Sequence, residues 1–240
     1  MKISTIAANV AVATLFLIAI GGCRKKYERP PVIKPCLLST VTSVATGNVE
    51  SFFYDDHNRL SLVHSGYESF LYEYGTNTKT ITERDAGTFV SRTHVTMNGA
   101  GLATNVKVET IEDGSTFSNT RYEYDGEQLT RSTLTFSWDT DSVITTYTWS
   151  NGNVVSAKEG VGVARPFEYY TDKLRQDGDI LQLTQTVSGY EIYRTRNLVK
   201  AFDNGTFIYS FDTKGKIRSV NIVSGENNDS SVYNYGYQCD

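Results

Sequence analysis

The chain has 240 residues, of which 39% are hydrophobic, enough to bury a substantial core in one or two domains. Its formal net charge of −4 lacks the basic signature expected of a nucleic-acid-binding protein. The 16 tyrosines and 11 phenylalanines, with abundant threonine and valine, favour strands over helices.

The first 22 residues are typical of a secretory signal peptide. Lys2 provides a short positive region, and a mainly apolar run follows from Ile6 to Ile20. As a helix this run would span about 22 Å, short of the ~30 Å hydrocarbon core of a bilayer. A cleaved signal therefore explains the segment better than a permanent transmembrane helix does.

The signal ends in Ile20-Gly21-Gly22-Cys23, which resembles the lipobox of bacterial lipoproteins: an apolar residue, two small residues and a cysteine. The resemblance implies cleavage before Cys23, whose diacylated thiol then anchors the mature chain to a membrane. Several acyl chains hold firmly, because each buried methylene adds roughly 0.8 kcal/mol. A plain secretory signal with an incidental cysteine is the alternative.

Residues 23–40 form a basic, proline-containing tether. Five basic side chains oppose only Glu28, and three of the four prolines lie here, at positions 30, 31 and 35. The tether either lies against anionic headgroups or is a plain spacer. Arg24 does not resemble the inner-membrane retention signal of enterobacteria, and the acidic export signal of Bacteroidetes surface lipoproteins is absent. We therefore expect the outer membrane, with the periplasmic or cell-surface side left open.

Two further cysteines, Cys36 and Cys239, bracket the domain that follows the tether. In an oxidising compartment they can pair. A disulfide between them would close a loop of about 200 residues and stabilise the fold by up to roughly 5 kcal/mol. Two free thiols are the alternative.

Residues 41–240 read as one domain of strands and turns. Tyr122 and Tyr124 put both rings on one face of a strand, and Asp125-Gly126 then favours a tight turn. Such aromatic hairpins recur about every 20 residues, which predicts an irregular internal repeat. The other aromatic anchors are Phe52–Tyr54, Phe70–Tyr74, Tyr147–Trp149, Phe167–Tyr170, Tyr190–Tyr193, Phe207–Phe211 and Tyr233–Tyr237.

Strands of ~9 residues with ~3-residue turns would place about 16 strands in this domain. No stretch shows a helical period with caps; 157–163 and 170–175 are the least regular parts, irregular or a short helix. So many antiparallel strands must curl, close or split into two packed sheets. We predict an all-β fold, an antiparallel meander of hairpins curled or closed into a barrel with its rings inside; a β-sandwich is the alternative.

Two resemblances to known families follow. Residues 54–60, Tyr-Asp-Asp-His-Asn-Arg-Leu, resemble the tyrosine-aspartate (YD) repeat of Rhs and teneurin-type shells, with Asn58 in place of glycine. Residues 211–217 match with Phe211 for the tyrosine and with conservative changes at the last two positions, Lys216 and Ile217. The lipobox, the length and the aromatic hairpins together resemble Bacteroidetes lipoproteins that contain a domain of unknown function with a porin-like fold. That resemblance implies a barrel-like meander and no known activity.

The sequence contains few catalytic signals. It has no H-E-x-x-H, Cys-x-x-Cys or G-x-S-x-G motif and no phosphate-binding glycine loop, so we expect neither an enzyme nor a metal or other cofactor. An envelope-polymer hydrolase with a catalytic pair of carboxylates stays open as an alternative, because acidic residues are plentiful. Asp141-Ser142-Val143 resembles the O-glycosylation site of Bacteroidetes envelope proteins, which makes Ser142 a candidate for modification.

We expect a non-catalytic structural, binding or accessory role in the cell envelope. The chain would be held to the membrane through Cys23. Its partner would be an envelope glycan or protein, and we expect no nucleic acid. The alternative is a glycan- or peptide-binding lipoprotein that stacks its ligand on Trp138, Tyr147 and Trp149. A membrane-spanning barrel is less favoured, because the lipid anchor would be redundant and the chain ends in Asp240 without a terminal aromatic residue.

Overall fold

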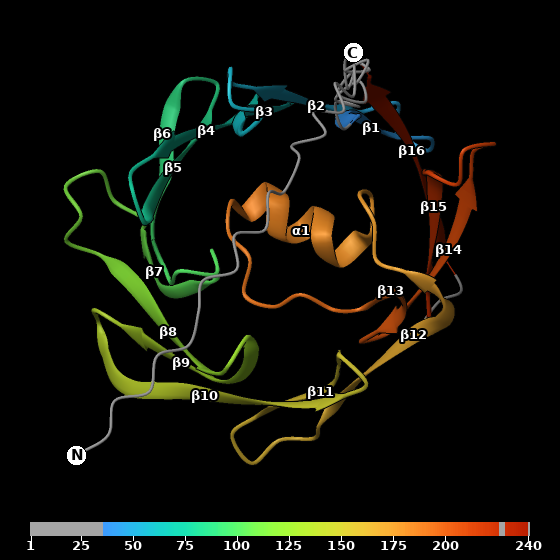
Figure 1. Cartoon of the computed structure of the whole chain (residues 1–240). Helices are drawn as coiled ribbons and strands as arrows, with labels where there is room; N and C mark the ends of the chain where they lie inside the picture. The colour runs from blue at the N-terminus through green and yellow to red at the C-terminus, as the bar shows by residue number, and fades with distance from the viewer. Residues whose placement is uncertain (1–35, 226–228, 240) are drawn as a thin grey trace, which may run out of the picture. The chain divides into compact units, whose positions relative to one another are not determined.

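A computed structural model describes residues 36–225 and 229–239. The signal peptide, Cys23 and the rest of the tether up to residue 35 lie outside these residues. Over the described ranges the chain forms an antiparallel meander of sixteen strands that closes into a barrel, with β1 paired to β16 (Figure 1). The prediction of an all-β meander of hairpins closed into a barrel is confirmed.

The first strand begins at Leu37, before the expected start of the domain at Val41. The strands are β1 (Leu37–Ser43), β2 (Val49–Tyr54), β3 (Leu60–Ser65), β4 (Glu68–Tyr74), β5 (Thr78–Asp85), β6 (Thr88–Met97), β7 (Ala103–Glu109), β8 (Phe117–Asp125), β9 (Gln128–Phe136), β10 (Asp139–Ser150), β11 (Asn153–Glu159), β12 (Arg165–Leu174), β13 (Asn197–Phe202), β14 (Gly205–Phe211), β15 (Ile217–Ser224) and β16 (Ser230–Gln238).

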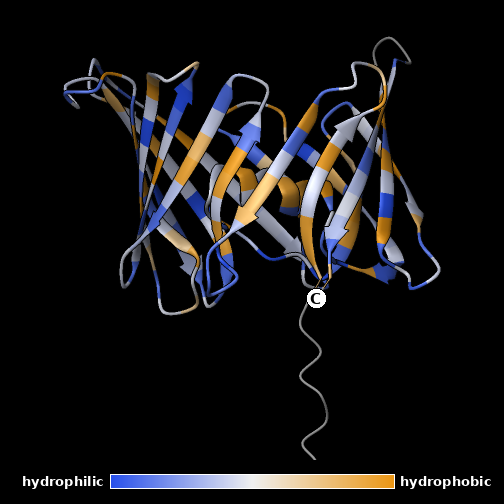
Figure 2. Ribbon diagram, turned by 90° about the horizontal axis from the view of Figure 1, so that it is seen from above, coloured by the Kyte–Doolittle hydropathy of each residue, from blue (hydrophilic) through white to orange (hydrophobic). Residues whose placement is uncertain are grey.

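Strand alternation separates an aromatic interior from a polar exterior. On β8, Tyr122 and Tyr124 are half-buried while Arg121 and Glu123 between them are exposed. Tyr124 donates a hydrogen bond to the Ile192 carbonyl, which belongs to a segment inside the barrel. The tyrosine face is therefore the lumen face, and the same alternation of apolar and polar residues runs along the other ribbons (Figure 2).

A meander of this kind places alternate turns at opposite ends of the barrel. We call the end that holds Cys36 and Cys239 the terminal end, and the other the far end. The YD-like turns lie at the terminal end. In the first of them Asp55 accepts hydrogen bonds from the backbone N–H groups of His57 and Arg59, at 2.9 Å each, and Asn58 takes a left-handed φ of 58°.

The connection from β12 to β13 folds into the lumen and contains the helix α1 (Ile180–Ser188) (Figure 1). The prediction that no capped helix occurs was wrong, because Asp179 caps the helix N-terminus and Gly189 ends it with a φ of 81°. Nine residues are too few for a stable isolated helix, so packing inside the barrel supplies what the local sequence lacks. Residues 190–193, predicted as a strand, are the return segment of this connection.

The stretches predicted to be least regular are mostly strand. Residues 157–159 complete β11 and residues 170–174 complete β12. The irregular part is the turn at 160–164, Gly-Val-Gly-Val-Ala, whose glycines interrupt the alternation of the flanking strands. Within the described residues no helix is long and apolar enough to cross a bilayer.

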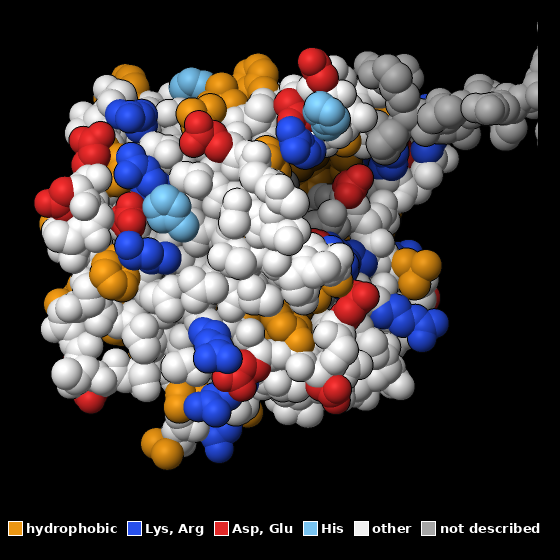
Figure 3. Space-filling model, turned by 60° about the vertical axis from the view of Figure 1, so that its left-hand side comes forward, with side chains coloured by type: hydrophobic (Ala, Val, Ile, Leu, Met, Phe, Trp, Pro, Cys, Tyr) orange, Lys and Arg blue, Asp and Glu red, His pale blue; other side chains and the backbone are white. Residues whose placement is uncertain are grey.

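Charged side chains occupy the outer wall of the barrel on many strands. Figure 3 shows one face on which basic and acidic side chains lie among uncharged ones and hydrophobic groups are small and separate. On this wall Glu109 forms ion pairs with Lys107 at 2.9 Å and His94 at 3.3 Å. The lysine hydrogen bond, together with the His94 contacts, outweighs desolvation and holds the pKa of Glu109 below its usual value. Outward charges on further strands are Arg121, Arg131, Lys158, Glu168, Lys200 and Arg218.

Candidate functional site

The lumen is the candidate functional site, and its terminal half is filled by a plug, which we define as residues 175–196 with α1 at its centre. Asp179 is fully buried and anchors the plug to the wall. Its Oδ1 accepts from the Leu181 N–H at 2.8 Å, and its Oδ2 accepts from the Val199 N–H of β13 at 3.1 Å. Burial raises the pKa of Asp179 in spite of these donors.

Two glycines let the plug approach the wall closely. Gly178 has a φ of 90°, and a Cβ there would lie 2.9 Å from the Tyr237 hydroxyl oxygen. Gly189 has a φ of 81°, and a Cβ there would lie 2.7 Å from Cγ1 of Ile81. Only glycine fits both the left-handed backbone and the available space at these positions.

Wall side chains hold the plug by hydrogen bonds to its backbone. The Tyr72 hydroxyl donates to the Val187 carbonyl at 2.5 Å, and Lys79 Nζ donates to the Gly189 carbonyl at 2.8 Å. The Tyr237 hydroxyl donates to the Ile217 carbonyl at 2.8 Å and shares this proton with the Asp177 carbonyl of the plug at 3.3 Å. These bonds come from β4, β5 and β16, so the plug is fixed to separate parts of the barrel rather than to one hairpin.

Burial changes the acid–base properties of these groups. It raises the pKa of most of the lumen tyrosines, that of Tyr54 to about 12, because the phenolate would lose its hydration. It lowers the pKa of Lys79 for the same reason, against the opposing effect of Glu191. The lumen tyrosines are therefore neutral hydrogen-bond donors at physiological pH.

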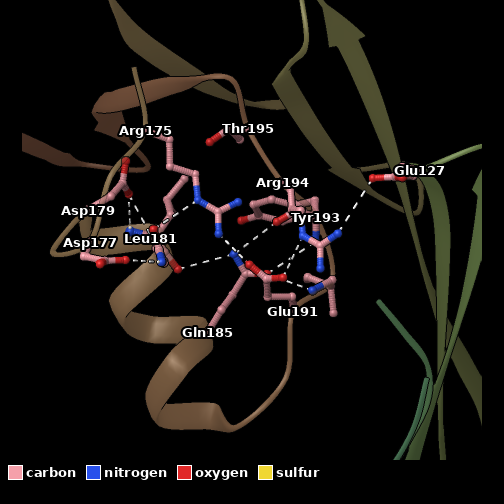
Figure 4. A network of polar contacts seen from close by, with 12 residues as sticks. Glu127, Arg175, Asp177, Asp179, Leu181, Gln185, Glu191, Tyr193, Arg194 and Thr195 are labelled. Carbon is pink, nitrogen blue, oxygen red and sulfur yellow. Dashed lines mark hydrogen bonds and ion pairs between the residues drawn. The ribbon is translucent and has the colours of Figure 1, made fainter. Parts of the chain in front are cut away.

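An ionic network fixes the return segment of the plug (Figure 4). Glu191 accepts from Arg175 at 2.5 Å and from Arg194 at 2.8 Å, and Arg194 also lies 3.8 Å from Glu127 on the β8–β9 turn. Burial acts to raise the pKa of Glu191, but the two arginines outweigh it and the pKa lies below its usual value. Gln185 completes the network by accepting from the Ile192 N–H at 2.7 Å.

A cavity of about 340 Å³ remains between α1 and the wall formed by β1, β2, β15 and β16. The helix contributes one face at positions 180, 183, 184 and 187, a helical spacing that brings these side chains together. The wall contributes mainly apolar groups, with Glu50 as the one charged side chain among the lining residues. A second cavity of about 260 Å³ shares Val41, Glu50 and Tyr233 with the first and reaches Thr46 and Asn48 in the β1–β2 turn at the far end.

The predicted site residues that the structure describes lie in different parts of the barrel and do not form one site. Cys36 and Cys239 form a disulfide directly before β1 and directly after β16, where Leu37 pairs with Gln238 and the barrel closes. Ser142 is exposed on β10 near the far end. Cys23 lies outside the described residues.

The three candidate stacking aromatics do not form one surface. Trp138 is 60% exposed in the β9–β10 turn, where its ring lies 5.1 Å from that of Phe136. Tyr147 and Trp149 lie at the opposite end of β10 and face the lumen. Trp149 donates to the Leu129 carbonyl at 2.8 Å, and the Tyr147 hydroxyl lies 3.2 Å from that of Ser132, so both polar groups are already engaged.

Sequence reasoning missed the residues that line the cavity. Glu50 looked like any other strand carboxylate, and its lumen position follows from strand parity with the buried Phe52. The plug carried a usable signal, since Asp179 precedes and Gly189 follows a run with apolar residues at helical spacing. Over the described residues, no group of three or more His, Cys, Asp or Glu side chains is arranged to hold a metal ion.

Two solved structures share this fold. A porin-like protein from Bacteroides uniformis ATCC 8492 has 15% sequence identity and a TM-score of 0.63, with 86% of this chain and 99% of that chain covered. A porin-like protein from Bacteroides vulgatus ATCC 8482 has 14% identity and a TM-score of 0.56, with 83% and 98% covered. No protein-family model and no curated protein matches the chain.

Proposed function

We propose that this chain is an outer-membrane lipoprotein, anchored through Cys23, whose barrel stands in water and serves a non-catalytic binding or accessory role in the cell envelope. One observation carries the proposal: a charged outer wall surrounds a lumen that is plugged except for a cavity. The solved porin-like structures share the fold at low identity, so the role is argued from this chain's own side chains.

The outer wall does not suit a bilayer. A spanning barrel presents an apolar band about 25 Å tall, and an outward Arg or Lys at the bilayer midplane costs ~2–4 kcal/mol. Here Arg121 is the central residue of β8, and Arg131 and Lys200 occupy similar positions in β9 and β13. Several such charges around one barrel favour water on the outside. The lipobox cysteine, Cys23, is then what attaches the protein to the membrane.

The lumen does not suit a channel. The plug is held at separate parts of the barrel: Asp179 binds Val199 of β13, and Tyr72 of β4 and Lys79 of β5 donate to its backbone. Displacing it would break all of these contacts together. The remaining space is a cavity open toward the far end, as expected of a barrel that holds a ligand or partner rather than conducts one.

An envelope-polymer hydrolase is the second candidate. Burial, with a further effect of Glu68, raises the pKa of Glu50, and a protonated carboxyl near an ionised one is the pairing that glycosidases use. The cavity beside Glu50 is mainly apolar, however, and offers few groups that could bind sugar hydroxyls. Release of reducing ends from envelope glycans that Glu50→Gln abolishes would favour the hydrolase over the non-catalytic role.

The anchor is tested by cell fractionation of a Cys23→Ala variant, with the parent protein as the control because it keeps the Cys36–Cys239 disulfide. We expect Cys23→Ala to leave the membrane fraction, while the parent stays there and carries an acylated Cys23 by mass spectrometry. If Cys23→Ala chains from which residues 1–22 have been removed, as checked by mass spectrometry, remain in the membrane after carbonate extraction, the barrel itself holds the protein there and the proposal fails.

A further inference from the structure

Acidic side chains line the lumen beside the cavity. Glu50 on β2 pairs in register with Ser65 on β3, which pairs with Glu68 on β4, which in turn pairs with Asp85 on β5. Opposed residues of an antiparallel pair share a face, so all of them face the lumen with Phe52. Glu83 shares this face of β5, two residues from Asp85.

Within residues 36–225 and 229–239, these carboxylates have no cationic partner. Among the described residues, no Lys, Arg or His forms an ion pair with Glu50, Glu68, Glu83 or Asp85, and only Glu83 has a hydrogen bond, from Ser91 at 2.7 Å. Lys79 lies on the lumen face of β5 but donates to the plug at Gly189. On the outer wall, by contrast, Glu109 is surrounded by three basic side chains. The lumen row therefore carries uncompensated negative charge.

A second observation points to a ligand in the adjoining cavity. Tyr235 lines the cavity, is only 8% exposed, and its hydroxyl has no hydrogen-bond partner among the described residues. An unpaired buried hydroxyl costs about 1–3 kcal/mol, and most lumen tyrosines avoid this cost by donating to a backbone carbonyl. Tyr235 is thus a cavity-lining side chain whose buried polar group the described part of the protein leaves unsatisfied.

We propose that the cavity binds a cationic amphiphile: a small molecule whose apolar body lies against Leu183, Val187 and Ile222 and whose amine, guanidine or quaternary ammonium head lies at Glu50 and Glu68. The apolar cavity and its continuation to the far end together have the size of small-ligand pockets, which span roughly 300–1,000 Å³. The carboxylate row would attract the head at the far end and select against anionic amphiphiles of the same length.

This inference deepens the proposed binding role but does not depend on the anchor. Binding can be measured on the purified Cys23→Ala protein, so failure of the lipoprotein assignment and failure of this site give different results. It also specifies the occupant that the proposed function leaves open.

The test uses isothermal titration calorimetry with three probes of equal chain length below their micelle concentrations: dodecyltrimethylammonium, dodecyl sulfate and dodecyl maltoside. We expect the cation to bind with one site per chain and at least about tenfold more tightly than the other two, which corresponds to about 1.4 kcal/mol. Equal affinity for all three probes, or no saturable binding of the cation, overturns the proposal.

Variants locate the site. Glu50→Gln should weaken binding of the cation about tenfold and leave dodecyl maltoside unchanged, whereas Glu73→Gln, at an outward-facing position of β4, should change neither. Val187→Trp should fill the cavity and weaken every probe that binds. If Glu50→Gln does not fold, Glu68→Gln provides the same charge test. Cation binding that survives removal of the lumen carboxylates but falls in Glu73→Gln places the site on the outer wall and refutes the inference.

Discussion

Replacing Asp179 should release the plug from the wall, because one buried carboxylate satisfies N–H groups of both. In Asp179→Ala the helix loses its N-cap, at about 1 kcal/mol. The Val199 N–H, on a residue that is fully buried, loses its acceptor, at about 1–3 kcal/mol. Removing a buried charge offsets part of this cost, so we expect a net loss of about 2 kcal/mol near neutral pH.

Urea unfolding followed by circular dichroism measures this loss as a shift in midpoint at unchanged slope. Asp177→Ala is the matched control, since Asp177 is exposed and, among the described residues, its side chain hydrogen-bonds only with Gln182, at 3.1 Å. We expect the control to lie within about 0.5 kcal/mol of the parent. If Asp179→Ala is no more destabilising than Asp177→Ala, the plug is not anchored through this carboxylate, and the description of the lumen is wrong.

Three further predictions concern the Cys36–Cys239 disulfide, the tyrosines of the lumen and the turn at Asp55. Cys36→Ser with Cys239→Ser should lower the free energy of unfolding by up to roughly 5 kcal/mol in the chain-entropy treatment of a loop this long, and dithiothreitol should reproduce the loss in the parent alone. Because burial raises the pKa of the lumen tyrosines, that of Tyr54 to about 12, alkaline titration of tyrosinate absorbance should begin at higher pH in the native protein than in urea. The corresponding stability is then present below the ordinary pKa near 10.0 and is lost as the pH rises through the folded values; identical native and urea curves would exclude a buried tyrosine lumen. Hydrogen bonds from Arg59 hold the pKa of Asp55 at about 2, so carboxyl NMR should find Asp55 still ionised at pH 3.8, and the stability it contributes should be lost only as the pH falls from there through about 2; a pKa at 3.8 would contradict the turn geometry.

Much of the barrel was predictable because its determinants are local. The period-two pattern of Tyr122 and Tyr124 against Arg121 and Glu123 assigns faces without any tertiary information. The same holds for turns such as Asp55–Arg59, in which the aspartate binds backbone donors within four residues. Strand number then follows from chain length, and sixteen antiparallel strands leave few ways to avoid open edges.

The plug and the cavity depend on contacts that sequence patterns do not record. α1 spans only nine residues, and its stability comes from contacts outside it: Tyr72 and Lys79 bind residues 115 and 110 positions away, and Val199 lies on the following strand, β13. The carboxylate row exists because three strand pairings place Glu50, Glu68 and Asp85 on one face. A one-residue slip in the register of any pairing would move one of these carboxylates to the outside. The row therefore could not be predicted from the local sequence of any single strand.

The position of the outer wall relative to the bilayer tests the account most directly. Thr130→Cys, Glu123→Cys and Lys200→Cys each place a thiol on an outward, exposed position of β9, β8 or β13. The native lipoprotein, with Cys36 and Cys239 paired and Cys23 acylated, would offer no other thiol. In proteoliposomes we predict that a membrane-impermeant maleimide labels all three positions fully and that lipid-borne nitroxides quench none of the attached fluorophores. Protection from the maleimide together with strong quenching at these positions would mean that the barrel crosses the bilayer, and the account would be wrong.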